Sequence, residues 1–223
     1  MKRIFLLLAI AMLALLSVAC ANDTTSNTTK QAPQIAAKTT YTNSLAGKKI
    51  LVAYFFATNN TKRVAEEIAQ ATGADIYRIE AAQSYSANPY DDKDLIQKEA
   101  YENLRPEVKA PLPASEMAKY DVIFVGSPIW WHQPAMVVCT FLEGYDLSGK
   151  TIVPFFTYGA RSYLNESMQR IYKSTPNSVH VPASLPKDIE PDNIQQSQND
   201  DDGIIMPADV DNIDTWLKVL QLK

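Results

Sequence analysis

The chain has 223 residues, 46% of them hydrophobic, and a formal net charge of -4. This length suits one domain of ordinary size with appendages, and the acidic balance argues against the basic face that nucleic acid or anionic lipid requires. The chain has two cysteines, Cys20 and Cys139, and two histidines, His132 and His180. These are too few for a disulfide framework, a zinc cluster or a multi-histidine metal site.

The N-terminus predicts an export signal. A basic start, Lys2-Arg3, precedes an apolar run over residues 4–19 that is shorter than the roughly 20 residues of a membrane-spanning helix and suits a signal peptide. The run ends LSVAC and resembles the bacterial lipoprotein signal, although that signal usually has Leu where Ser17 stands. We expect a lipoprotein signal peptide over residues 1–19 and a lipidated Cys20 that anchors the exported protein to the outer side of a bacterial membrane, in its cell envelope. The alternative is plain secretion with an incidental cysteine.

The segment that follows the signal is rich in Thr, Asn and Ala and has almost no large apolar side chain. Such a segment buries too little surface to offset the entropy lost on ordering. We therefore expect a flexible tether over residues 20–46 and a folded domain over residues 47–223.

Buried strands alternate with amphipathic helices along this domain. Strands are expected at residues 50–55, 76–79, 122–125, 151–156 and 179–181. Helices are expected at residues 61–70, 91–104, 136–145, 162–173 and 209–222. The alternation predicts an α/β doubly wound sheet of five parallel strands with helices on both faces. Within it, Pro154 predicts a bulge or a missing hydrogen bond, and residues 183–207 read as a long surface loop.

Ligands of open parallel sheets bind beyond the carboxyl ends of the strands, where three loops are expected to converge. The first loop, residues 56–61 (FATNNT), leads from a strand into a helix, whose N–H groups and positive end favour a phosphate. Thr58 and Thr61 add hydroxyl donors, and Asn60 adds an amide. The alternative is an ordinary helix cap without a ligand.

The other two loops supply aromatic side chains. The loop over residues 126–134 (GSPIWWHQP) contains adjacent tryptophans, which are difficult to bury together and suit stacking on a flat ring. The alternative is a structural pair that covers a helix. In the third loop, residues 157–160 (TYGA), Gly159 permits close backbone approach and Tyr158 could lie on a ring; the alternative is a plain turn.

Over roughly residues 47–176 these features resemble the flavodoxins, most closely a short-chain bacterial group. The group's first loop, S-x-T-G-N-T, is matched at Thr58, Asn60 and Thr61, with Phe56 in place of Ser and Asn59 in place of Gly. Its P-I-W-W-G is matched at Pro128, Ile129, Trp130 and Trp131, with His132 in place of Gly. Its T-S-G-G is matched at Thr157 and Gly159 but not at Tyr158 and Ala160, and the stretch FLEGYDLSGKTIVPF fits the segment before that loop.

The resemblance implies a flavodoxin-like sheet of strand order 2-1-3-4-5 and FMN as the redox group, with no catalytic side chain and no metal. The implied cofactor-binding residues are Thr58, Asn59, Asn60, Thr61, Pro128, Ile129, Trp130, Trp131, His132, Thr157, Tyr158 and Gly159. We expect Trp130 to be the ring contact. Asn59 is expected to keep the turn, since Asn adopts positive φ more readily than other non-glycine residues. Phe56 removes a hydroxyl donor worth roughly 0.5–1.5 kcal/mol and is expected to weaken FMN binding.

The leading interpretation is an FMN protein of the cell envelope that exchanges electrons with a redox protein or a small molecule. One alternative is an FMN-dependent reductase of quinones or similar acceptors, although the sequence has no basic cluster for a nicotinamide 2′-phosphate. The other is a surface lipoprotein that keeps the fold and has lost the flavin.

Overall fold

The structure is a computed structural model that describes residues 44–86, 88–158, 163–181, 204–205 and 213–223. Its strands are β1 (Ile50–Tyr54), β2 (Asp75–Arg78), β3 (Val122–Trp130), β4 (Gln133–Pro134), β5 (Thr151–Thr157), β6 (Val179–His180) and β7 (Ile204–Ile205). Its helices are α1 (Asn60–Thr72), α2 (Lys93–Tyr101), α3 (Ala114–Met117), α4 (Met136–Glu143), α5 (Leu164–Ser174) and α6 (Ile213–Val219).

The described strands form one sheet whose main path runs β2-β1-β3-β5-β6, all parallel. This path is the predicted order 2-1-3-4-5 of five parallel strands, so the predicted fold class is confirmed. Two short antiparallel strands are added to it, because β4 pairs with the end of β3 and β7 pairs with the end of β5.

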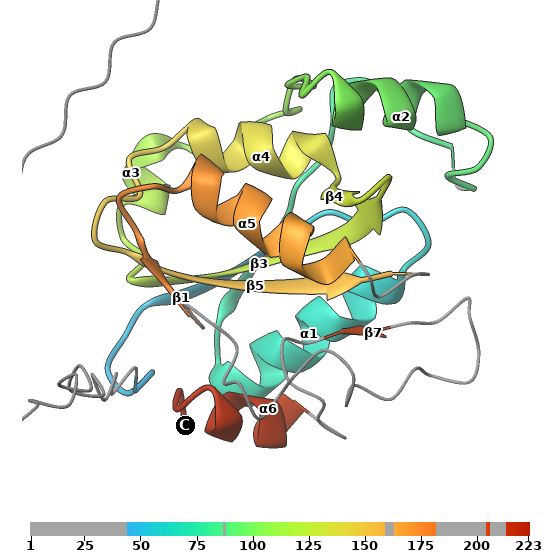
Figure 1. Ribbon diagram of the computed structural model, residues 1–223. Coiled ribbons are helices and arrows are strands. Elements are labelled where there is room, and N and C mark those ends of the chain that lie inside the picture. Colours follow the sequence, from blue (N-terminus) through green and yellow to red (C-terminus); the bar gives the residue numbers. More distant parts are fainter. Residues whose placement is uncertain (1–43, 87, 159–162, 182–203, 206–212) are drawn as a thin grey trace, which may run out of the picture. The chain divides into compact units, whose positions relative to one another are not determined.

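Helices cover both faces of the sheet (Figure 1). Along β1, Leu51 and Ala53 face one apolar cluster while Val52 and Tyr54 face the other, as the alternation of side chains in a strand requires. The first cluster takes in side chains of α2, α3, α4 and α5, and the second takes in side chains of α1 and α6. Both faces of the central strands β1, β3 and β5 are therefore buried, which explains why these strands are nearly continuous apolar runs. The edge strand β2 is mostly exposed.

Pro154 does not interrupt the sheet. The pairing of β5 with β3 runs in register from Thr151 to Thr157, without the predicted bulge. On the other edge of β5, β6 pairs with its first two residues and β7 with Phe156 and Thr157. Pro154 lies between these two stretches, so its missing N–H group costs none of the described strand pairing.

Three segments differ from the sequence-based prediction. The strand expected at residues 122–125 continues to Trp130, and the predicted loop is reduced to a tight hairpin turn. The short helix α3 follows directly after Pro113, which occupies its N-cap. Residues 204–205, predicted as loop, form β7, whereas residues 182–203 lie outside the described part of the chain.

Candidate functional site

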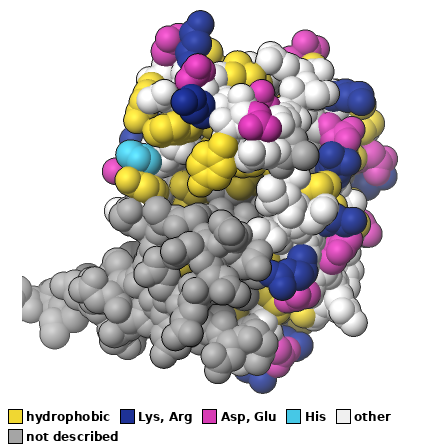
Figure 2. Space-filling model, turned by 90° about the vertical axis from the view of Figure 1, so that its right-hand side faces the viewer, with side chains coloured by type: hydrophobic (Ala, Val, Ile, Leu, Met, Phe, Trp, Pro, Cys, Tyr) yellow, Lys and Arg dark blue, Asp and Glu magenta, His cyan; other side chains and the backbone are white. Residues whose placement is uncertain are grey.

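The carboxyl ends of β1, β3 and β5 meet at one end of the sheet, on the right in Figure 1. Figure 2 looks onto this end, and in its described part hydrophobic side chains gather side by side with a histidine at their margin. The loops that leave these strands carry the residues singled out from the sequence. The structure thus brings the first two candidate loops and the start of the third to the same end of the sheet.

The first loop ends in a helix start that is not capped by the side chain of its own N-cap residue. Asn59 is the N-cap of α1 and adopts a left-handed conformation, with φ 65° and ψ -9°, and its side chain makes no capping hydrogen bond. The first turn of α1 contains no acidic residue and includes Lys62 and Arg63. Asn59 therefore adopts the positive φ predicted for it, and the helix start has the N–H groups and the positive potential that favour an anion.

A buried hydroxyl pair joins the first loop to the third. Thr61 Oγ1 lies 2.7 Å from Thr157 Oγ1, and the two residues are 2% and 5% exposed. One hydroxyl donates to the other, and the accepting hydroxyl keeps a proton that it can donate in turn. The pair fixes the start of α1 against the end of β5, although the two residues are far apart in the sequence.

Phe56 does not extend freely over the helix start. Its ring stacks on Tyr54, with centroids 5.9 Å apart and planes 17° apart, and the guanidinium carbon of Arg78 lies 4.4 Å from its centroid. Arg78 also forms an ion pair of 3.1 Å with Glu80. The ring is therefore held against β1 and β2 by its contacts with Tyr54 and Arg78. The expected effect of Phe56 on ligand binding stays a prediction.

The aromatic loop is a hairpin turn with two residues at positive φ. Trp131 and His132 connect β3 to β4 with φ of 48° and 68°. Turns of this mirror-image type normally contain Asn-Gly or a similar pair, because bulky side chains resist positive φ. A bulky residue at positive φ raises the free energy of the folded protein by about 1–3 kcal/mol, and such residues tend to occur at functional sites.

The two tryptophans have different surroundings. Trp130 is 9% exposed and packs edge-to-face against Phe55 and Tyr85, each with its ring centroid 5.3 Å away. Trp131 is 38% exposed, and its ring lies 6.4 Å from that of Tyr101 in a tilted arrangement. These exposures favour Trp131, rather than Trp130, as the side chain that offers a face to a ligand.

Helix α5 and its N-cap support this turn. The ring of His132 stacks on that of Tyr163 at 3.5 Å and 9°, and the His132 carbonyl accepts a hydrogen bond from Ser167 at 3.4 Å. Arg170 Nε donates to the side-chain oxygen of Gln133 at 2.8 Å, and its Nη1 donates to Asn103 at 2.7 Å. The turn is therefore fixed from the side of α5.

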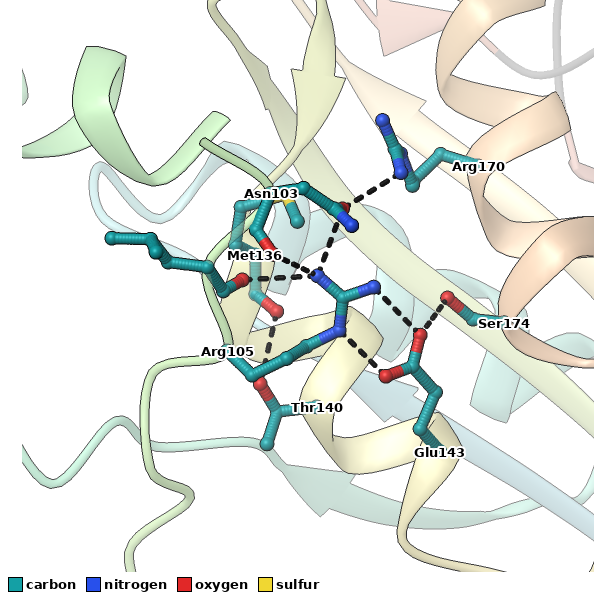
Figure 3. Close-up of polar contacts among 8 residues, drawn as sticks. Asn103, Arg105, Met136, Thr140, Glu143, Arg170 and Ser174 are labelled. Carbon is teal, nitrogen blue, oxygen red and sulfur yellow. Dashed lines mark hydrogen bonds and ion pairs between the residues drawn. The ribbon is translucent and has the colours of Figure 1, made fainter. Parts of the chain in front are cut away.

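Through Asn103, Arg170 joins a wider polar network that is centred on Arg105 (Figure 3). Arg105 donates to both carboxylate oxygens of Glu143, at 2.6 and 2.9 Å, and Ser174 donates to Glu143 at 2.7 Å. Arg105 also donates to Asn103 Oδ1 at 2.9 Å. The network links the segment after α2 to α4 and α5, and α5 is the helix that contacts the hairpin turn.

A buried carboxyl contacts Tyr85, one of the two rings that pack against Trp130. Glu99 is 5% exposed, and the Tyr85 hydroxyl donates to it at 2.8 Å. Burial raises the pKa of Glu99, while the hydrogen bond from Tyr85 acts in the opposite direction. This pair has no local signal in the sequence, and neither do Arg78, Tyr163 and Arg170, because each acts through a contact with a distant segment.

The remaining candidates are placed as follows. Thr58 is exposed, Asn60, Pro128 and Ile129 are half-buried, and Tyr158 is 9% exposed. Gly159 and Cys20 lie outside the described residues. In the described ranges, no group of three or more His, Cys, Asp or Glu could hold a metal ion. No helix in those ranges is long and apolar enough to cross a membrane.

The fold and site define a doubly wound α/β protein with an anion-favouring helix start and an aromatic turn at the carboxyl ends of its strands. The family model described as Flavodoxin matches residues 49–197, which is more than half of the chain. The chain therefore belongs to the flavodoxin family. No protein of curated function matches it.

Solved structures agree with this assignment. A protein from Bacteroides eggerthii, assigned as a flavoprotein, is 30% identical over 79% of this chain and 99% of its own, with a TM-score of 0.55. A second, from Bacteroides uniformis and assigned likewise, is 31% identical over 62% of this chain and 93% of its own, with a TM-score of 0.51. A flavoprotein from Lactobacillus acidophilus, solved in complex with FMN, is 22% identical over 60% of this chain and 89% of its own, with a TM-score of 0.50, and shares the fold.

Proposed function

We propose that this protein binds FMN at the carboxyl ends of β1, β3 and β5 and transfers electrons through it. The observation that carries the proposal is the buried pair of Thr61 and Thr157, which joins the start of α1 to the end of β5. Membership of the flavodoxin family supports it, as does the FMN complex of the Lactobacillus acidophilus relative.

The residues present fit the cofactor. The N–H groups at the start of α1, with the hydroxyls of Thr58 and Thr61, suit a phosphate. The exposed face of Trp131 suits one side of a flat ring. Trp130 packs against Phe55 and Tyr85 and so anchors the end of β3 that leads into the turn. When bound, FMN supplies the redox chemistry, and the side chains hold it in place and limit its contact with water.

The direct test is an absorbance spectrum of the purified mature protein, recorded before and after FMN is added and unbound ligand is removed. Retained absorbance of the flavin in the visible range, in equal amounts of flavin and protein, is the expected result. A protein that stays colourless after addition of FMN would instead be a surface protein that keeps the fold without the cofactor.

We also propose that the protein is exported and anchored by a lipid on Cys20. Support comes from the sequence, in which a basic start and an apolar run end at this cysteine. Replacement of Cys20 by Ala should release the protein from the membrane fraction or leave its signal peptide uncleaved. Unchanged membrane association and unchanged gel mobility of the Cys20→Ala protein would contradict the proposal.

A second candidate function is the reduction of a small planar acceptor such as a quinone. The observation that favours it is the pair of exposed rings of Tyr101 and Trp131, which are 61% and 38% exposed at the margin of the site. Turnover of NADH or NADPH with a quinone would support a reductase. Electron exchange without such turnover would support a carrier whose partner is another redox protein.

A further inference from the structure

We propose that Arg78, at the end of β2, binds the phosphate of the ligand at the start of α1. This inference rests on the proposed function, because it takes a phosphate-bearing ligand to occupy that end of the sheet. It assigns a guanidinium to a site that the sequence motif supplies only with N–H groups, hydroxyls and an amide.

The strand pairing places Arg78 next to the phosphate-binding loop. β2 runs parallel to β1, and Arg78 is the partner of Tyr54, the last residue of β1. Its guanidinium carbon lies 4.4 Å from the ring centroid of Phe56, the second residue after that strand on the way to α1. Because the Phe56 ring in turn stacks on Tyr54, the guanidinium has a fixed apolar support at the entrance of the loop.

This support gives the replacement of Ser by Phe56 a physical role. The motif loses a hydroxyl donor at this position, and the aromatic ring that replaces it holds a cation beside the same loop. A guanidinium has five N–H donors in a planar fork that matches the oxygens of a phosphate, and it remains charged at every physiological pH. In the ion pair with Glu80, the carboxylate contacts Nη1 of Arg78.

The charges around the start of α1 also favour a phosphate there. Lys62 and Arg63 lie in the first turn of α1, which has no acidic residue. Lys62 is paired with Glu66 at 3.7 Å, one turn further along the helix. Arg78 adds a cation from the neighbouring strand, with 52% of its side chain exposed and therefore accessible to a ligand.

Equilibrium titrations with FMN and with riboflavin, which lacks the phosphate, test the inference. We expect Arg78→Gln to weaken FMN binding about fivefold at low salt and to leave riboflavin binding unchanged. The FMN effect should shrink as salt is added. The control is Lys119→Gln, which removes the same charge from a residue paired with Glu116 ahead of β3, at the other end of the sheet. It should change neither affinity.

Two results would overturn the inference while leaving FMN binding intact. One is an Arg78→Gln protein that binds FMN as tightly as the wild type does. The other is an equal loss of affinity for FMN and for riboflavin in Arg78→Gln, which would mean that Arg78 acts on the ring or on the fold. In that case Arg78→Lys, which keeps the charge, would not restore FMN affinity any more than riboflavin affinity. A wild-type protein that binds neither flavin would instead overturn the proposed function, and this inference with it.

Discussion

Replacement of each tryptophan of the turn by Ala should separate support from ligand contact. Trp130 is 9% exposed and packs edge-to-face against the rings of Phe55 and Tyr85, which also contact each other. Trp130→Ala should therefore lower the free energy of unfolding by about 3–5 kcal/mol, the usual cost of removing a buried aromatic side chain. Trp131 is 38% exposed and has a tilted contact with Tyr101, so Trp131→Ala should cost about 1 kcal/mol or less.

Ligand binding should respond in the opposite order. Trp131→Ala removes ring stacking worth roughly 0.5–1.5 kcal/mol beyond the lost apolar contact, so FMN affinity should fall about tenfold. Urea unfolding measures the stability of each variant, and quenching of flavin fluorescence measures binding to the folded protein. Trp131→Phe is the matched control, since it retains an aromatic face and should retain most of the affinity. Full FMN affinity in Trp131→Ala, together with a large loss in folded Trp130→Ala, would refute this assignment of the two rings.

Three further predictions concern other parts of the structure. Thr61→Val breaks the hydroxyl pair with Thr157, so it should weaken FMN binding and lower the free energy of unfolding by about 1 kcal/mol; unchanged values in both measurements would contradict the role of the pair. The hydrogen bond from Arg105 lowers the pKa of Glu143, so Glu143→Gln should cost about 1 kcal/mol of stability at pH 7. That difference should disappear as the pH falls through this lowered pKa, and a difference independent of pH in urea unfolding would exclude the ion pair as its cause. Burial raises the pKa of Cys139, so a bulky thiol reagent should label it slowly in the native protein and rapidly in urea; rapid native labelling would contradict its burial.

The sheet could be predicted from the sequence because its central strands, β1, β3 and β5, are buried on both faces. Such strands appear as short continuous apolar runs, and the helices between them leave clear stop signals such as Gly73, which adopts a φ of 70° after α1. The hairpin after β3 could not be predicted, because Trp131 and His132 lack the Asn-Gly signature of the turn that they form. In the structure, the His132 ring of this turn stacks on Tyr163, the N-cap of α5, so a contact with a distant segment holds the turn.

Only those residues of the candidate site that belong to a local sequence motif could be predicted. Thr61 and Thr157 were recognised separately, from two loops, and the structure shows that they form a hydrogen-bonded pair. Arg78 and Glu99 had no local signal, since each lies in an ordinary polar position of a strand or helix. Their relation to the site comes from strand register in one case and from burial against Tyr85 in the other.

We propose that this member of the flavodoxin family binds FMN at the carboxyl ends of its strands. An equilibrium titration of flavin-free mature protein with FMN, followed by flavin fluorescence, tests it most directly. We predict saturable quenching with one FMN per protein molecule, at an affinity that Trp131→Ala and Thr61→Val each reduce. Fluorescence that rises in proportion to added FMN, as it does in buffer, would contradict the account.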